Sequence, residues 1–120
     1  MSFSPVLEKL GILDWTADRS GFPFGYFNPA QYVRGALVES WEQPDPVTYV
    51  LRIRQGVRWH NKAPMNGRAL TAQDVEWNYH RYLGLGSGFS KGSPFIAQWG
   101  PLDDTGIVSV EATDQHTVVI

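Results

Sequence analysis

Histidine is the first residue type in this 120-residue chain that could carry chemistry, because an imidazole can serve both as a metal ligand and as a general base. The chain has three, His60, His80 and His116, and no two stand in the H-x-x-x-H or H-E-x-x-H spacing that puts two ligands on one helix face. There is no cysteine to complete a metal site. We therefore expect no metal and no other cofactor, and we interpret the histidines as surface or loop residues.

Carboxylates, glycines and serines could also do chemistry, but their patterns do not indicate catalysis. Asp103 and Asp104 are adjacent, so they would point to opposite faces of a strand or be solvated in a turn. The glycine-rich stretch 84–88 follows a helical pattern and lacks the Lys-Ser/Thr ending of a phosphate-binding loop. Neither G-x-S-x-G nor S-x-x-K occurs. We expect no catalytic residue and no enzymatic activity.

Aromatic side chains are the remaining feature, and they serve both protein cores and ligand grooves. The chain has 5 Trp, 5 Tyr and 6 Phe. For Trp41, Tyr49 and Trp59, which lie in alternating segments, we expect packing in the core. Core and groove both stay open for five aromatics in Gly/Pro-rich segments: Phe22, Phe24, Tyr26, Phe27 and Phe95.

Extended segments must position most of these residues. Residues 36–42 and 47–54 alternate between apolar and polar side chains, and 43–46 predicts the turn between them. The second segment places Tyr49, Leu51 and Ile53 on the face expected to meet the core. Residues 57–60 resume this strand, and 107–112 with 117–120 predict a C-terminal hairpin, so the expected sheet is antiparallel.

One helix has a clear start and a clear end. Thr71 to Asp74 has the spacing of a capping box, and Gly84 provides a C-terminal stop. Between them, apolar and aromatic residues recur at helical spacing: Val75, Tyr79, Tyr82 and Leu83. Shorter helical turns are predicted at 4–10 and 94–99, and an irregular, aromatic-rich loop at 14–32.

Composition limits the class of protein. With 42% hydrophobic and 18% charged residues, the chain suits one domain over 1–120. The net charge is −2 and basic residues never form a run, so we expect no nucleic-acid partner. The N-terminus has neither the basic start nor the apolar stretch of a signal peptide. Because 117–120 is an apolar run in mid-strand, we expect the chain to be a piece of a longer protein.

Several motifs, in order, resemble those of the family 5 solute-binding proteins. They are Leu37–Glu42, Tyr49–His60 and Leu70–Val75, and residues 108–119 resemble the family's next hairpin. The likeness covers residues 36–120, and residues 1–35 form a lead-in with weaker similarity. Two departures are the loop between His60 and the helix cap, which is longer than usual, and Gln73, where Glu is commoner.

The resemblance implies an α+β fold: a small antiparallel sheet with flanking helices, forming the accessory subdomain of a class II periplasmic-binding-protein-like receptor. Such receptors have about 500 residues, so a chain of 120 would be about a quarter of one. The implied partners are a peptide or other small solute, the remaining lobes of the receptor and the permease subunits of an ATP-binding-cassette (ABC) importer. The implied location of the full-length protein is extracytoplasmic, in the periplasm or at the outer face of the membrane.

The resemblance also implies one ligand-binding residue. In the family, an aromatic that follows Ser-Pro after the capped helix can approach the bound peptide, and here Phe95 follows Ser93 and Pro94. The alternative is that Phe95 packs on its own subdomain. The alternative to a transport receptor is a self-contained ligand-sensing or carbohydrate-binding module.

Overall fold

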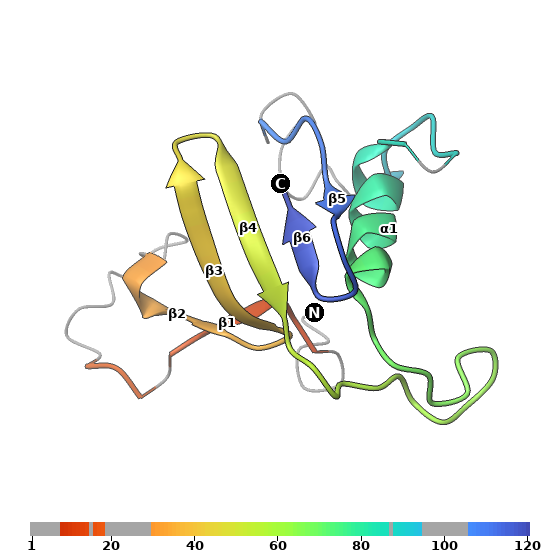
Figure 1. Cartoon of the computed structure of the whole chain (residues 1–120), viewed down its shortest axis with the longest axis horizontal. Coiled ribbons are helices and arrows are strands. Elements are labelled where there is room, and N and C mark those ends of the chain that lie inside the picture. Colours follow the sequence, from red (N-terminus) through yellow and green to blue (C-terminus); the bar gives the residue numbers. More distant parts are fainter. Residues whose placement is uncertain (1–7, 15, 19–29, 87, 95–105) are drawn as a thin grey trace.

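The computed structural model describes residues 8–14, 16–18, 30–86, 88–94 and 106–120 (Figure 1). Its elements show the predicted α+β class. They are, in chain order, β1 (Gly11–Leu13), the 3-10 turn η2 (Ala30–Tyr32), β2 (Val33–Gly35), β3 (Val38–Asp45), β4 (Thr48–Ile53), α1 (Ala72–Leu83), β5 (Glu111–Ala112) and β6 (Thr117–Val119).

The main sheet has four antiparallel strands in the order β3-β4-β6-β5. Figure 1 shows the long β3–β4 hairpin beside the short β5–β6 hairpin, with α1 next to the latter. Both hairpins were predicted. The two hairpins are joined by the pairing of β4 with β6, in which Val50 lies opposite Val119 and Leu51 opposite Val118. A separate pair, β1 with β2, joins two short segments for which no strand was predicted.

Strand β3 is longer than predicted, since it continues through Pro44 to Asp45 and the turn moves to residues 46–47. Proline has no N–H for a sheet ladder and is tolerated at a sheet edge, which is where β3 lies. The Asp45 carboxylate accepts a 2.9 Å hydrogen bond from the Val47 N–H and so closes the turn. The edge position therefore explains why proline did not end the strand.

A bulge in β3 decides which of its side chains face inward. Val38 pairs with Ile53 and Ser40 with Arg52, so Glu39 is an extra residue on the β3 side. Without it, Val38 and Trp41 would point to opposite faces. With it, Trp41 lies opposite Leu51 and shares the inner face with Val38.

The core lies between this inner face and α1. Its buried apolar residues come from the sheet, the helix and the segments that precede each: Val38, Ile53, Leu70, Ala72, Val75, Leu83, Val110 and Val118. The predicted inward face of β4 is confirmed for Ile53, which is 1% exposed, and Leu51 packs partly buried against the core. Tyr49 lies on the same face, but it is 43% exposed, so the core packing predicted for it is wrong.

Helix α1 begins and ends as predicted. Thr71 is the N-cap in an extended conformation and forms a capping box with Asp74. Gly84 is the C-cap in the left-handed region, with φ 75°, and its N–H donates to the His80 carbonyl at 2.8 Å. A Cβ on Gly84 would also stand 2.5 Å from the Gly92 nitrogen, so glycine is required there. Among the described residues, no helix has the length and apolar character needed to cross a membrane.

Other local predictions were wrong. Residues 57–60 do not form a strand and contribute only an isolated bridge between Arg58 and Ala69, because Gly56, with φ 78°, breaks the extended backbone. The strand expected at 107–112 is confined to β5. Residues 8–10, the described end of the helical turn predicted at 4–10, are not helical. The turn predicted at 94–99 lies almost wholly outside the described residues.

Candidate functional site

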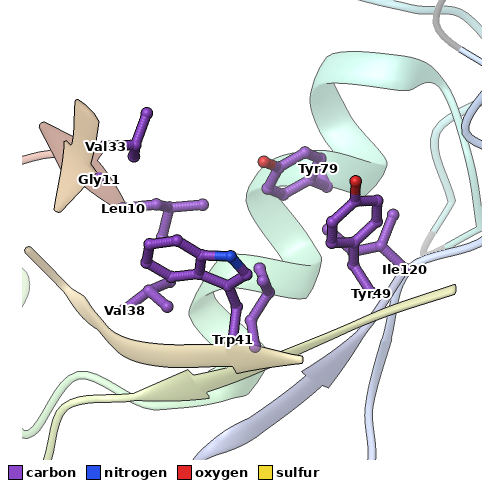
Figure 2. Close-up of a pocket in the computed structure, with 9 residues that line it drawn as sticks. Leu10, Gly11, Val33, Val38, Trp41, Tyr49, Tyr79 and Ile120 are labelled. Carbon is purple, nitrogen blue, oxygen red and sulfur yellow. The ribbon is translucent and has the colours of Figure 1, made fainter. Parts of the chain in front are cut away.

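An open hollow of about 250 Å³ lies on the inner face of the sheet, beyond the part that α1 covers (Figure 2). Residues of β1, β2, β3, β4 and α1 contribute to it, together with the residue just before β1 and the residue just after β6. The lining consists of Leu10, Gly11, Val33, Val38, Trp41, Tyr49, Leu51, Tyr79 and Ile120.

Two aromatics expected in the core stand at this opening. Trp41 is 42% exposed, whereas Val38 on the same face is 3% exposed. Tyr49 is likewise 43% exposed, and its backbone pairs with Ile120 through hydrogen bonds of 2.8 and 2.9 Å. The physical reason is coverage, since α1 packs on β5 and β6 and leaves this end of β3 and β4 bare. The prediction of core packing is therefore wrong for Trp41 and Tyr49 in this chain.

The hollow is apolar with a few hydrogen-bonding groups. Figure 2 shows Tyr49 and Tyr79 on one side, Leu10 and Val33 on the other, and the Trp41 indole between them. None of the lining residues is charged. Burial raises the pKa of Tyr79, so its phenol stays neutral and protonated over an even wider pH range than usual. The hydroxyls and the indole N–H are the polar groups that the lining side chains offer.

A second cluster holds the start of α1 and centres on Asp74. The Asp74 carboxylate accepts hydrogen bonds from the Thr71 N–H at 3.0 Å, from the Arg68 guanidinium at 2.7 and 2.5 Å and from the Trp59 indole at 3.2 Å. The Arg68 guanidinium lies 5.7 Å from the Trp59 ring centroid, within cation–π range. Burial opposes ionisation of Asp74, but these hydrogen bonds outweigh it and hold the pKa of that carboxyl below its usual value.

Trp59 thus has a structural role that differs from the predicted one. It was expected in the core, yet it is 36% exposed and joins the loop before α1 to the helix cap. Its partners Arg68 and Asp74 lie 9 and 15 positions further along the chain. The cluster is saturated with internal bonds, so we assign it to stability rather than to ligand binding.

The histidines lie on separate elements. His60 is exposed before the loop, and His116 lies in the turn between β5 and β6. His80 is on α1, where its Nε2–H donates to the Val110 carbonyl at 2.7 Å and so fastens the helix to the segment before β5. Within the part of the chain that the structure describes, no three His, Asp or Glu residues are grouped to hold a metal ion.

Phe95, the predicted ligand-binding residue, lies outside the described residues, as do Asp103, Asp104 and the aromatics at 22–27. The segment that leads to Phe95 is described as far as Pro94. There the Ser93 N–H donates to the Tyr82 carbonyl at 2.9 Å, so this segment is attached to the last turn of α1.

An open apolar hollow is typical of a unit that binds a ligand or packs against another protein surface. The comparison with protein families agrees. Residues 32–120 match the family described as bacterial extracellular solute-binding proteins, family 5 Middle. The chain belongs to this family, which consists of binding receptors.

Solved receptor structures contain a similar unit. HbpA2 from Haemophilus parasuis is 30% identical with a TM-score of 0.53, over 73% of this chain and 18% of that one. DppA from Helicobacter pylori, a periplasmic binding protein solved with the peptide STSA, is 25% identical with a TM-score of 0.55, over 82% and 19%. MoaA from A. tumefaciens R10, solved in complex with mannopinic acid, is 29% identical with a TM-score of 0.50, over 82% of this chain and 17% of that one.

The chain therefore spans less than a fifth of the length of these three receptors. No match was found among the curated proteins.

Proposed function

We propose that this chain is part of an extracytoplasmic substrate-binding protein that captures oligopeptides or similar small solutes and delivers them to an ABC importer. The observation that carries this proposal is the family match over residues 32–120. The peptide bound by the H. pylori DppA favours oligopeptides as the solute, and the mannopinic acid bound by MoaA shows why the solute class needs its own test.

Within that receptor, residues 1–120 act as an accessory subdomain that contributes a wall but not the whole site. This reading is supported by the small share of each solved receptor that the chain spans, 17–19%. A strong small-molecule site buries most of the ligand surface, and a unit of 120 residues is expected to supply only part of that enclosure. The remaining lobes and the permease subunits are the proposed partners, and the receptor catalyses no reaction.

Phe95 is the residue of this chain that we propose for solute contact. The supporting observation is the attachment of Ser93 to the last turn of α1, which gives the segment before Phe95 a defined origin on the helix. An aromatic ring suits this role because it offers a large apolar surface with few rotatable bonds.

The receptor polypeptide that carries this chain tests both proposals by isothermal titration calorimetry. We expect saturable binding of a tripeptide or tetrapeptide pool with a Kd on the order of micromolar, and no binding of matched sugar and opine sets. Phe95→Ala should weaken peptide binding by at least several-fold. The control, Val47→Ala at the 86% exposed tip of the β3–β4 hairpin, should not. Binding of sugars or opines instead of peptides would overturn the proposed solute class, and an unchanged Kd for Phe95→Ala would overturn the role of Phe95.

A further inference from the structure

We propose that the hollow lined by Trp41, Tyr49 and Tyr79 receives apolar side chains from a segment of the same receptor that lies outside residues 1–120, and that it is not a solute site. This inference rests on the proposed function, because it needs the chain to work within a longer receptor. It assigns one face of the unit to internal packing.

The first argument is the continuity of the hollow with the core. Val38 belongs to both, and the bulge at Glu39 places Trp41 on the same inner face of the sheet. Along this face, exposure rises from 1% at Ile53 to 43% at Tyr49, which is on the same strand. Inward positions of a sheet are normally covered along their whole length. A face that is buried at one end and exposed at the other therefore indicates a core that another protein segment completes.

The second argument is the reach of the elements that are present. Helix α1 has 12 residues and so is about 18 Å long. It packs against β5 and β6, and of its side chains Tyr79 extends into the hollow. On the opposite side the two-stranded sheet contributes the first residue of each strand, Gly11 of β1 and Val33 of β2. The described elements therefore border the opening without closing it.

The third argument is the chemistry of the lining. It has no charged side chain, and its polar groups are two phenols and an indole N–H. A peptide or an opine carries charged groups, and binding one tightly requires charged or closely placed polar partners. Apolar side chains of another protein segment need none of these. The lining therefore fits a protein segment better than a solute.

The fourth argument is the amount of polypeptide available to cover the face. This chain spans 17–19% of each of three solved receptors of similar fold, so about four fifths of such a receptor lies elsewhere. One Trp and one Tyr, Trp41 and Tyr49, are each more than two-fifths exposed in the same hollow, which is ordinary at a surface between parts of a receptor.

The test is the solvent exposure of Trp41, measured by ¹⁹F NMR as the H₂O/D₂O isotope shift of 5-fluorotryptophan. Resonances of the five Trp are assigned with single Trp→Phe variants, and Trp77, 51% exposed on α1, is the exposed reference in the chain-alone samples. The samples are the 120-residue chain at low and at high concentration, the solute-free receptor, and the receptor with the peptide pool. We expect a large shift for Trp41 in the chain at both concentrations, a shift several-fold smaller in the solute-free receptor, and no further change with peptide.

Three results would overturn the inference. Loss of Trp41 exposure in the chain alone at high concentration would assign the face to a second copy. Loss only after peptide addition would make the hollow a solute site, and a large shift in every sample would leave the face open to solvent. Heat of peptide binding, recorded on the same receptor sample, tests the proposed function separately, because Trp41 can be shielded in a receptor that binds no peptide.

Discussion

Asp74 is the side chain on which the start of α1 depends most. The sequence predicted its role in the capping box, because Asp74 follows Thr71 at the required spacing. It could not predict the bonds from Arg68 and Trp59, since these residues converge on Asp74 only through the path of the loop at 61–68. A capping box lies within four consecutive residues and can be predicted from them, whereas side-chain contacts across a loop depend on the path of that loop.

We expect Asp74→Asn to destabilise the chain by about 0.5–2 kcal/mol at neutral pH, because the amide loses the charge that Arg68 binds and is a poorer acceptor for the Thr71 N–H. The pKa of Asp74 is lowered on folding, so its contribution is present above the usual carboxyl value of 3.8 and is lost as the pH falls through the lower, folded value. The difference between variant and parent should therefore shrink on acidification. Urea unfolding at neutral and at acidic pH measures it.

The exposed Glu42→Gln on β3 is the matched control for Asp74→Asn and should change the unfolding free energy by less than about 0.5 kcal/mol at either pH. A difference between Asp74→Asn and the parent that stayed constant down to the lowest pH would contradict the charge-based role of this carboxylate.

The aromatic residues show where residue-level prediction failed. Trp41, Tyr49 and Trp59 have the alternation of core residues, and the pattern correctly placed Trp41 and Tyr49 on the inner face. Alternation reports which face a side chain occupies, but not whether another element covers that face. Coverage depends on how far α1 reaches, and on polypeptide beyond this chain if our inference holds.

At the scale of elements, the hairpins and α1 followed from local patterns, and the joining of the hairpins did not. Strand β6 inserts between β4 and β5, so its residues meet β4 across more than 60 positions of sequence. No periodicity encodes that choice. The bulge at Glu39 was also missed, because the composition of a strand does not show which of its residues is left without a partner.

Ile53 tests the assignment of β4 as an inner strand of the sheet whose side chains enter the core. Because Ile53 is 1% exposed, Ile53→Ala should cost about 2–5 kcal/mol and Ile53→Val about 0.5–1.5 kcal/mol in the unfolding free energy. The milder variant keeps the measurement feasible if the alanine variant does not fold. Val47→Ala, at the 86% exposed turn of the same hairpin, should stay within about 0.5 kcal/mol of the parent. Equal effects for Ile53→Val and Val47→Ala in urea unfolding would contradict this packing.

At the scale of the whole molecule, the chain is an α+β unit whose sheet has an inner face that is buried at one end and exposed to solvent at the other. A chain of 120 residues buries roughly two thirds of the surface it exposes when unfolded, which is enough for one modest core. That core accounts for Ile53, Val110 and Val118, and the bare end of the sheet accounts for the hollow. The resemblance of ordered motifs predicted the family, and the match over residues 32–120 confirmed it.

The most direct test of the account is a titration of the isolated 120-residue chain with a mixed tripeptide pool, followed by the fluorescence of its five Trp and by calorimetry. If the chain is one wall of a larger receptor, it encloses too little of a solute for strong binding, and no saturable signal should appear below about millimolar. Saturable binding at about micromolar concentration, to peptides or to sugars, would contradict the account and favour a self-contained binding module.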